Sequence, residues 1–546
     1  MRTFDIIFSI LGAGAVVVAS LRYVHMLQLE SYQGNMYVKW LRRAGKNDVL
    51  TCMLFGAAAM LLRMAWMLLY HDSAVISTIL LYGCDVLYIA AMVYLSISNR
   101  KRAEQKKPIV YTSRVKRLLA ILAVLSFLFH MNVNLFTTKA YTTFPLLITM
   151  NILRYLPGLM LPSFVLLCAC VALPIENAVK NRYLNDAKRK LQAREDIIKI
   201  AVTGSYGKTS TKFILGTILQ EKFNTLVTPQ SFNTPMGITR VIREQLEAGH
   251  EAFVAEMGAR YAGDIDELCD LVQPTYGIIT SVGKQHLDTF GSYENVIKTK
   301  SELLLRLPED GAAFLNGDNE DCRQMYENCN LKNKYLFGLD YEGELFLRAT
   351  DVRVTKQGST FTLETSSKER VECKTSLLGK HNILNITGAA AVAKHMGLTL
   401  EQIASGISNV QPVEHRLQLI EGPVTVIDDA FNANPAGTKA AMEVLRAFAP
   451  ANRVVVTPGM VELGDEEEAL NEAFGKDIAS AADVVILVGQ QRVEPIFRGL
   501  IAAGFDEGNI LRAQNLAQVT KMLPQYAPPG SVVLFENDLP DNYSGE

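Results

Sequence analysis

The stretch Ala201-Val-Thr-Gly-Ser-Tyr-Gly-Lys-Thr-Ser-Thr-Lys212 indicates both the fold of the chain around it and the ligand bound there. An apolar run typical of a buried strand, Ile197–Val202, leads into it, and the core-facing side of a helix, Phe213–Leu219, follows. A strand, a Gly-rich turn, Lys-Thr and a helix form the layout of a phosphate-binding loop. Gly204 and Gly207 have no Cβ, so the backbone can turn sharply and bring its N–H groups close to phosphate. The stretch therefore predicts an α/β domain that binds a nucleotide.

Two side chains at the predicted helix start complete this loop. Lys208 supplies a mobile cation for the β- and γ-phosphates, and Thr209 supplies an oxygen for Mg²⁺. The general motif has a glycine where this chain has Val202, so the loop is shorter than in the commonest nucleoside triphosphatases. An ordinary Gly-rich turn is the alternative, which Gly-Lys-Thr in this context disfavours. The expected phosphate-binding residues are Gly204, Ser205, Gly207, Lys208, Thr209 and Ser210.

Composition excludes several classes of protein. The 546 residues are enough for about three or four domains. A net charge of −2 gives no global electrostatic case for binding nucleic acid. The eight cysteines include no Cys-x-x-Cys pair, which argues against a zinc site or a disulfide framework. Hydrophobic residues make up 49% of the chain, because an apolar first third precedes an ordinary remainder.

Residues 1–175 predict an α-helical transmembrane domain. Several apolar stretches in tandem are near or above the ~20 residues that cross a bilayer, which disfavours buried helices of a soluble protein. The predicted spans, about five, are Phe4–Val24, Leu50–Tyr70, Ser73–Ser96, Leu118–Phe136 and Phe144–Leu173, the last interrupted by prolines. Basic loops favour an N-terminus outside the cell and everything after the spans in the cytoplasm. Asp85, His130 and Arg154 within the spans could form a functional set, and the alternative is that they snorkel to the interface or form a local pair between helices.

The remainder of the chain predicts a linker and two α/β domains. Residues 176–196 read as a charged linker helix. From residue 197 apolar strands alternate with amphipathic helices, which is typical of a doubly wound sheet. We expect a central ATP-binding domain over 197–412 and a second α/β domain over 413–546. Within the first, 334–377 predicts short antiparallel strands.

Polar side chains follow the strands of the central domain. Glu256 ends one apolar run, and His286 comes shortly after the next one, Tyr276–Val282. Ligands of open α/β sheets bind at the carboxyl ends of strands. We therefore expect the phosphate loop, Glu256 and His286 to meet at one edge of the sheet, with Lys300 nearby on a following helix.

These motifs together resemble the Mur ligase family of ATP-dependent amide-bond synthetases. The matching pieces occur in family order over nearly two-thirds of the chain: TGSYGKTSTK (203–212), SFNTPMGITR (231–240), EMGARYAGDI (256–265), ITSVGKQHLDTFGS (279–292), KTKSEL (298–303), GKHNILN (379–385), HR (415–416) and DDAFNANP (428–435). Within the family they resemble the branch that adds D-Ala-D-Ala to a muramoyl-tripeptide. The resemblance implies a P-loop central domain and a Rossmann-like C-terminal domain.

The resemblance implies chemistry in two steps. A carboxylate attacks the γ-phosphate of ATP to form an acyl phosphate, and an amine then attacks that anhydride. Lys208 would stabilise the transferring phosphoryl group, while Thr209 and Glu256 would hold Mg²⁺. His286 matches a ligand of a second Mg²⁺, although its chemistry alone suggests a general base or a structural role, since Mg²⁺ prefers oxygen ligands. Lys300 matches a lysine carried as a carbamate, and an unmodified lysine paired with Glu302 is the alternative.

The resemblance also implies contacts to the nucleotide and to the substrates. Asn385, with Asn382 alongside, matches the adenine-binding amide, and a helix cap is the competing interpretation. Arg416 matches an arginine between the domains that reaches the phosphates, and Asp429 matches a carboxylate that binds ribose. The residues expected to face the substrates are Asn233, Thr234, Asn432 and Asn434.

Which carboxylate is used stays open at this stage. The implied partners are a cell-wall precursor carboxylate, an amino-acid or dipeptide amine, and the lipid bilayer, with no nucleic acid. The soluble ligase carries an N-terminal domain for the UDP-sugar, and this chain has predicted spans in that place. A poly-γ-glutamate-type synthetase, or a ligase for a lipid-linked cell-wall substrate, is therefore the alternative. A transporter or membrane scaffold with a nucleotide-sensing domain is a third interpretation.

Overall fold

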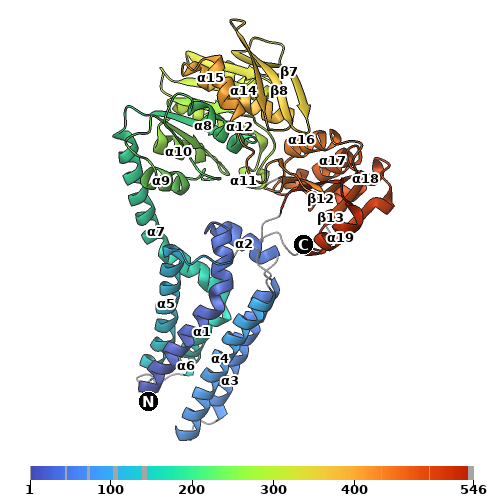
Figure 1. The fold of residues 1–546 in the computed structure, drawn as a ribbon. Helices are drawn as coiled ribbons and strands as arrows, with labels where there is room; N and C mark the ends of the chain where they lie inside the picture. Colours follow the sequence, from blue (N-terminus) through green and yellow to red (C-terminus); the bar gives the residue numbers. More distant parts are fainter. Residues whose placement is uncertain are drawn as a thin grey trace. The chain divides into compact units, whose positions relative to one another are not determined.

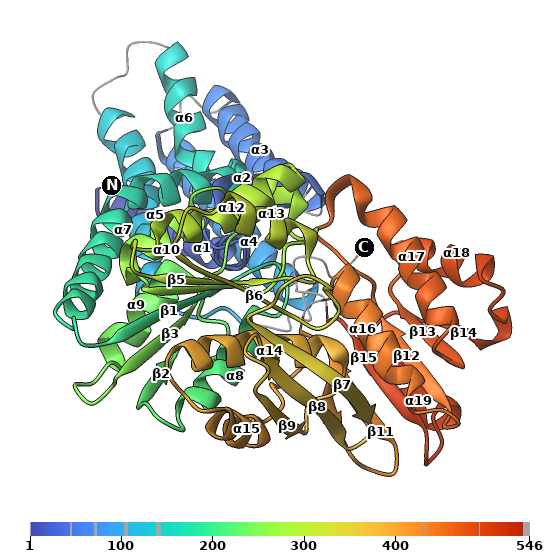
Figure 2. The same cartoon turned by 90° about the horizontal axis from the view of Figure 1, so that it is seen from above.

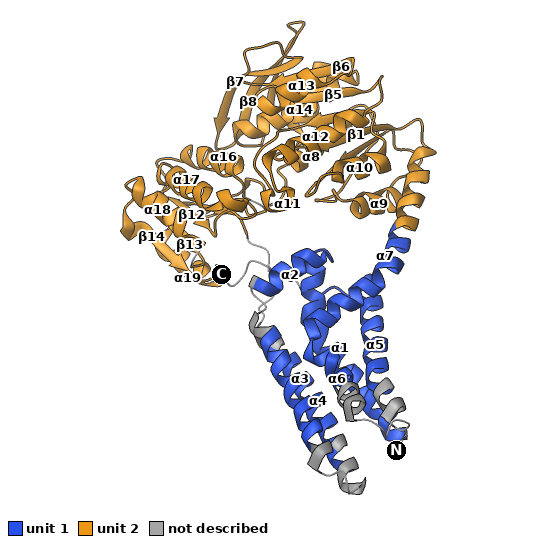
Figure 3. Cartoon of the chain, turned by 180° about the vertical axis from the view of Figure 1, so that it is seen from behind, with its two compact units in different colours: residues 1–180, 540–544 blue, residues 181–539, 545–546 orange. Residues whose placement is uncertain are grey.

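The computed structural model describes residues 2–43, 46–69, 74–102, 108–137, 144–431, 433–490 and 492–538. The chain divides between Lys180 and Asn181 into two compact units, which Figure 3 distinguishes by colour. Each unit has its own core and is described separately.

The first unit is a helical bundle (Figure 1). Its core is built largely from α1, α4, α5 and α7, around Tyr23, Tyr88 and Tyr155. The helices are α1 (Arg2–Leu29), α2 (Gly34–Arg43), α3 (Lys46–Leu69), α4 (Ala74–Arg102), α5 (Ser113–Thr137), α6 (Phe144–Leu159) and α7 (Leu161–Gln192). The described parts of the predicted apolar stretches lie on helices, and α2 lies between the first two stretches, where a basic loop was expected. The last stretch is divided between α6 and α7, and α7 continues as one helix through most of the predicted linker.

Two helical segments are long and apolar enough to cross a membrane among the residues that the structure describes, Thr3–Leu29 and Leu161–Gln192. Val49–Ala65 and Tyr82–Ser98 are shorter apolar helical segments. A buried helix of a soluble protein or a signal sequence meets the same criterion of length and composition. The arrangement with about five spans therefore stays a prediction.

The bundle buries a charged network between its helices. The Asp85 carboxylate accepts hydrogen bonds from Arg154 Nε at 3.0 Å, Arg63 Nη1 at 3.1 Å and the Tyr155 hydroxyl at 2.9 Å. Arg154 Nη1 also donates to the backbone oxygen of His130 at 3.3 Å. The predicted trio therefore does come together, as an interhelix ion pair in which the His130 backbone, rather than its ring, takes part.

The second unit begins with a nine-stranded sheet in the order β2-β3-β1-β4-β5-β6-β7-β8-β9. Strands β2 to β7 run parallel, and β8 and β9 complete the sheet as antiparallel neighbours. The bounds are β1 (Ile198–Thr203), β2 (Thr225–Val227), β3 (Ala252–Glu256), β4 (Tyr276–Ile279), β5 (Ala312–Asn316), β6 (Asn333–Gly338), β7 (Leu347–Thr355), β8 (Gly358–Thr365) and β9 (Arg370–Thr375). The prediction that 334–377 is entirely antiparallel is wrong for β6, which pairs in parallel with β5 and β7.

Helices cover both faces of this sheet (Figure 2). One core lies under α9, α10, α12 and α13 with the end of α7, and the other lies under α8, α14 and α15. The bounds are α8 (Lys208–Leu219), α9 (Pro235–Glu244), α10 (Asp264–Val272), α11 (Leu287–Phe290), α12 (Tyr293–Arg306), α13 (Glu320–Asn328), α14 (Lys380–His395) and α15 (Leu400–Ser408). The layers leave the carboxyl ends of β1, β3 and β4 side by side.

A six-stranded sheet follows in the order β10-β11-β15-β12-β13-β14, in which only the β10–β11 pairing is antiparallel. The strands are β10 (Gln418–Ile420), β11 (Thr425–Asp429), β12 (Arg453–Thr457), β13 (Val484–Val488), β14 (Ile510–Ala513) and β15 (Val532–Glu536). The α-helices are α16 (Pro435–Arg446), α17 (Glu467–Ala479), α18 (Glu494–Ala502) and α19 (Leu516–Tyr526). This parallel sheet between helices fits the Rossmann-like form expected for the C-terminal domain.

Candidate active site

The phosphate loop is built as the sequence predicts, between the end of β1 and the start of α8. Gly204 (φ 145°) and Gly207 (φ 77°) adopt backbone conformations that side chains rarely allow. A Cβ on Gly207 would lie 2.4 Å from Asn385 Oδ1, so the amide of that residue lies directly against the loop. Substitution of Gly207 would therefore disturb both the turn and the approach of Asn385.

The Lys208 ammonium folds back over its own loop. Its Nζ donates to the carbonyl oxygens of Gly204 at 2.7 Å and of Ser205 at 3.0 Å. Burial lowers the pKa of Lys208 to about 8, and nearby Arg416 adds to that, although Glu256 opposes it. The lowered pKa thus reflects mainly the burial of the ammonium, and the negative charge of bound phosphates would raise it again.

Hydrogen bonds from Ser205 hold the loop against the segment that follows β4. Ser205 N donates to the Ser281 carbonyl at 2.7 Å, and Ser205 Oγ donates to the Gly283 carbonyl at 3.0 Å. The predicted binding residue Ser205 therefore serves the loop's own structure, whereas Ser210 lies in the first turn of α8. These bonds fix the position of the loop relative to the segment that leads to His286.

Glu256, at the end of β3, accepts hydrogen bonds from three other residues of the site. It is buried, and its Oε1 accepts hydrogen bonds from Thr209 Oγ1 and Asn233 Nδ2, both at 3.0 Å. Its Oε2 accepts from Lys212 Nζ at 3.1 Å. Burial alone would raise the pKa of Glu256, but the ammonium groups of Lys212 and Lys208 hold it below the usual value. The carboxylate is therefore ionised at neutral pH and available to a cation.

Lys212 is a site residue that the sequence analysis did not single out. Its side chain is completely buried and forms an ion pair with Glu256. The sequence did contain a clue to this role, because Lys212 lies on the otherwise apolar, core-facing side of α8. A charge buried there needs a partner of opposite charge. Lys212 supplies the positive charge that balances Glu256 in this structure.

We expect Lys212→Met to destabilise the second unit by about 3–5 kcal/mol, because it leaves the Glu256 carboxylate buried without its partner. The midpoint of thermal unfolding measures this. The matched control is Lys222→Met, at an exposed lysine just after the same helix. The double variant Lys212→Met/Glu256→Gln should recover part of the loss, since no unpaired charge remains. Equal midpoints for Lys212→Met and Lys222→Met would contradict this assignment.

His286 and Lys300 lie near the phosphate loop, as predicted. His286 adopts a left-handed conformation (φ 53°) before α11, and its Nδ1 hydrogen-bonds to Glu462 of the C-terminal domain. Lys300 is buried on α12, and burial together with the positive charge of Lys208 lowers its pKa to about 7. Glu302 accepts from the backbone nitrogens of Gly263 and Asp266 instead, so it caps α10. The alternative of a Lys300–Glu302 pair is therefore not found among the described residues.

Arg416 crosses from the C-terminal domain to the phosphate loop. Its Nη2 donates to Thr209 Oγ1 at 3.2 Å, and its guanidinium lies 4.4 Å from the centre of the Phe431 ring. The two residues that flank it, His415 (φ 59°) and Leu417 (φ 48°), both have left-handed backbones. The arginine thus reaches the loop from a strained connection.

Asp429 is half-buried at the end of β11. Its Oδ1 accepts from Leu417 N at 3.1 Å, and burial raises the pKa of Asp429 to about 6. Glu536 is its register partner on β15, and burial beside Asp429 raises the pKa of Glu536 well above the usual value. Asp429 therefore lies at the carboxyl end of its strand, and in this structure its carboxylate supports the Arg416 segment.

The predicted amide and hydroxyl residues divide into two groups. Asn385 and Asn233 contact the loop and Glu256, as described above. Asn382 donates to the Leu378 carbonyl at 2.8 Å, and Thr234 and Asn434 accept hydrogen bonds from backbone nitrogens as the N-caps of α9 and α16. The helix cap named as the alternative for Asn382 and Asn385 is not found, because the N-cap of α14 is Gly379 and no side chain of the described residues caps that helix. Asn432 lies outside the described residues.

The donor set suits magnesium at one position. Thr209 and Glu256 offer oxygen, and Mg²⁺ is usually held by one or two carboxylates together with phosphates and water. No group of three or more His, Cys, Asp or Glu side chains that could hold a metal occurs among the described residues. His286 and Lys300 fit a second ion only if Lys300 becomes an anion, because a bare ammonium would repel the metal.

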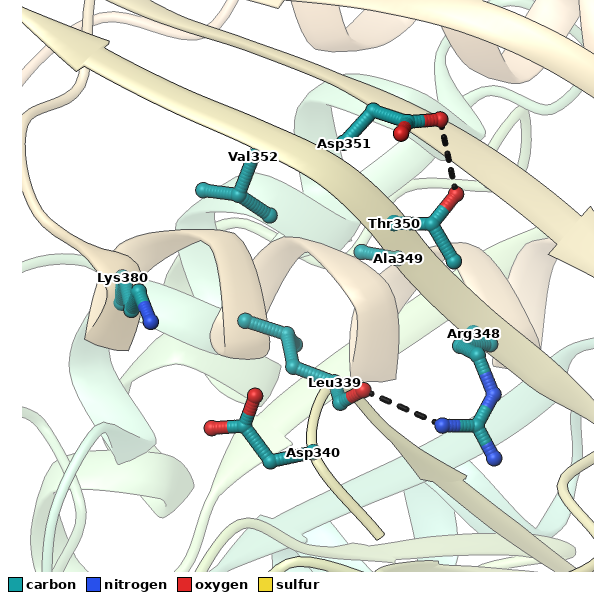
Figure 4. A pocket seen from close by; sticks show the side chains of 8 residues that line it. All are labelled: Leu339, Asp340, Arg348, Ala349, Thr350, Asp351, Val352 and Lys380. Carbon is teal, nitrogen blue, oxygen red and sulfur yellow. Dashed lines mark hydrogen bonds between the residues drawn. The ribbon is translucent and has the colours of Figure 1, made fainter. Parts of the chain in front are cut away.

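A pocket of about 260 Å³ lies elsewhere, between β7 and the start of α14 (Figure 4). Its lining includes Arg348, Asp351 and Lys380. Arg348 donates to the Leu339 carbonyl at 3.1 Å, as Figure 4 shows. None of the predicted site residues lines this pocket, so the candidate site rests on the phosphate loop and its neighbours.

Comparisons with known families match both domains of the second unit. The model of the Mur ligase middle domain matches residues 202–393, and that of the Mur ligase glutamate ligase domain matches 415–536. These two ranges contain every predicted site residue.

Curated relatives carry a common name, UDP-N-acetylmuramoyl-tripeptide–D-alanyl-D-alanine ligase. The protein of Escherichia coli strain K12 is 36% identical over 296 residues, which are 54% of this chain and 64% of that protein. The protein of Bacillus subtilis strain 168 is 29% identical over 62% of this chain and 72% of its own length. The protein of Mycobacterium tuberculosis strain H37Rv is 30% identical over 62% and 69%. This chain therefore spans about two-thirds of the length of these relatives.

Solved structures give the same result. MurF from Acinetobacter baumannii is 28% identical, with a TM-score of 0.60 over 66% of this chain and 77% of that one. MurF ligase from Thermotoga maritima, solved in complex with ADP, is 27% identical, with a TM-score of 0.59 over 66% and 80%. The fold of the second unit is thus shared with structures of this kind.

Proposed function

This chain belongs to the Mur ligase family, and we propose that it is an ATP-dependent, ADP-forming ligase that adds D-Ala-D-Ala to a muramoyl-tripeptide in peptidoglycan synthesis. The observation that carries the proposal is the meeting of Lys208, Glu256 and Arg416 at the phosphate loop. The names of the relatives supply the substrates.

The reaction asks the protein mainly to position reactants and to neutralise charge. The substrate carboxylate attacks the γ-phosphorus, which forms an acyl phosphate and releases ADP. The amine then attacks the acyl carbon, loses a proton, and phosphate leaves. Lys208 and Arg416 balance the phosphate charge, because both cationic groups lie at the loop.

Magnesium would be held by Thr209 and Glu256, and by His286 with carbamylated Lys300 at a second position. When bound, Mg²⁺ neutralises the charge that develops on the phosphates. For adenine and ribose we propose Asn385 and Asp429, and for the acceptor the loops around Asn233 and Asn434.

We further propose that the first unit anchors the ligase at the cytoplasmic face of a membrane. The division would be spans over 1–175, a linker helix over 176–196, the central domain over 197–412 and the C-terminal domain over 413–546. Of 34 large apolar side chains that are exposed among the described residues, 27 lie before residue 181. An apolar surface of this extent suits lipid better than water.

This apolar surface also favours a second candidate, a ligase whose carboxylate is lipid-linked or polymeric. The deciding experiment incubates the detergent-solubilised full chain with ATP, Mg²⁺ and one pair of substrates. The pairs are UDP-muramoyl-tripeptide with D-Ala-D-Ala, lipid-linked muropeptide with D-Ala-D-Ala, and glutamate alone. Phosphate release and mass spectrometry follow the products.

We expect the amide product from the UDP-linked tripeptide, with phosphate release that depends on both substrates. Product from the lipid-linked substrate alone would replace the first proposal with the second. ATP turnover that needs no acceptor would contradict both, and would favour a nucleotide-driven role of another kind.

A further inference from the structure

The loop after β12 meets the loop after β4 in a contact between two domains. Glu462, from the first of these loops, hydrogen-bonds through Oε2 to His286 Nδ1 in the second. Both residues have left-handed backbones, with φ values of 64° for Glu462 and 53° for His286. Two unusual conformations are thus combined in one side-chain contact, which indicates a specific requirement for it.

Neighbouring contacts hold this arrangement in place. Arg260 Nη1 lies 3.5 Å from Glu462 Oε1, and Lys284 Nζ lies 2.6 Å from Glu466 Oε2. Leu463, between the two glutamates, is buried. Arg260 therefore holds one oxygen of the Glu462 carboxylate, and the burial of Leu463 fixes the backbone next to Glu462.

This hydrogen bond determines which nitrogen of His286 is free. A neutral imidazole has one N–H group and one lone pair. Because a carboxylate only accepts hydrogen bonds, Nδ1 carries the proton and Nε2 keeps the lone pair. Carboxylates orient metal-binding histidines in the same way, by fixing both the tautomer and the plane of the ring.

We infer that Glu462 is a positioning residue for the second metal position. It orients His286 so that Nε2 faces the site as a ligand. The C-terminal domain thereby contributes to a metal position whose ligands lie in the central domain. This inference rests on the proposed function only in requiring a metal–ATP complex, and it holds whichever carboxylate and amine are joined.

The first test measures binding of Mn²⁺, in place of Mg²⁺, to the full chain with ATP and without acceptor. Loss of an outer partner of a metal-bound histidine typically costs 10–100-fold in affinity. We expect a loss on this scale in Glu462→Ala and a smaller one in Glu462→Gln. The matched control is Glu466→Ala, which removes the other ion pair between the same loops and should change the affinity by about twofold or less.

The second test observes the imidazole itself. The protein has eight histidines, so a sample labelled with ¹⁵N only in histidine gives few signals, and His286→Gln identifies the one required. We expect an unprotonated Nε2 in the native protein and in Glu466→Ala, and a mixture of tautomers in Glu462→Ala. An unchanged His286 signal in Glu462→Ala would overturn the inference, as would equal Mn²⁺ affinities in Glu462→Ala and Glu466→Ala. Because no acceptor is present, neither result depends on which substrates the ligase joins.

Discussion

Replacement of Lys208 by Ala is expected to lower the rate of ADP formation at least about 10³-fold, on the scale of other cations that stabilise a transferring phosphoryl group. The lysine ammonium already lies over the loop, where it donates to the carbonyl oxygens of Gly204 and Ser205. Bound phosphates offer it stronger partners, because ionised acceptors form stronger hydrogen bonds than carbonyl groups. The loss should therefore appear mainly in the rate of transfer.

The measurement is phosphate release at saturating ATP, together with ATP binding in the absence of acceptor. Lys222→Ala is the matched control, since Lys222 is exposed and away from the phosphate loop: it donates to the carbonyl oxygens of Met396 and Gly397, and its ammonium lies 5.3 Å from the centre of the Phe223 ring. Turnover of Lys208→Ala within tenfold of the native rate would refute the role given to Lys208.

Replacement of Lys300 by Ala is expected to lower turnover by about 10²–10³-fold, the cost of removing one group that stabilises transition-state charge. The reason lies in the proposed carbamate, which forms only from the neutral amine. Since burial and the positive charge of Lys208 lower the pKa of Lys300 to about 7, far more of it is neutral near pH 7 than of an ordinary lysine, whose pKa is about 10.4. Raising the pH through 7 increases the neutral fraction, so carbamate formation should increase with it.

The carbamate can be observed directly in protein equilibrated with ¹³C-bicarbonate, by NMR of the labelled carbon. The signal should be present in the native protein and absent in Lys300→Ala. Lys298→Ala is the control, because Lys298 lies on the same helix but is exposed. A native protein without the signal, or a Lys300→Ala variant with full activity, would rule out the carbamate.

Local patterns were enough to predict the central part of the site. The turn at Gly204 and Gly207, the helix start at Lys208 and the strand end at Glu256 each depend on a few neighbouring residues. Ligands bind at the carboxyl ends of parallel strands, and this rule predicted that these residues lie near His286. The predicted family is confirmed by the comparisons.

The features of the structure that were not predicted depend largely on residues far apart in the chain. Glu462 is 176 residues from His286, and no spacing rule connects two loops of different domains. Strand β6 comes from a short apolar run, and such a run does not reveal whether the neighbouring strands are parallel or antiparallel to it. Helix α2 was not predicted, because its basic residues give the segment the composition of a cytoplasmic loop. The hydrogen bond from Asn382 to the Leu378 carbonyl also could not be predicted, because local sequence does not reveal which backbone oxygen a side-chain amide meets.

The strained backbone on either side of Arg416 also bears on how the two α/β domains meet. Arg416 and Glu462 both reach the site from the C-terminal domain, Arg416 at Thr209 and Glu462 at His286. Left-handed conformations at His415 and Leu417 each cost about 1–2 kcal/mol, and a rotation that returns them to ordinary angles recovers that energy. In this structure, the hydrogen bonds of Arg416 to Thr209 and of Leu417 to Asp429 therefore offset backbone strain in the connection between the two domains.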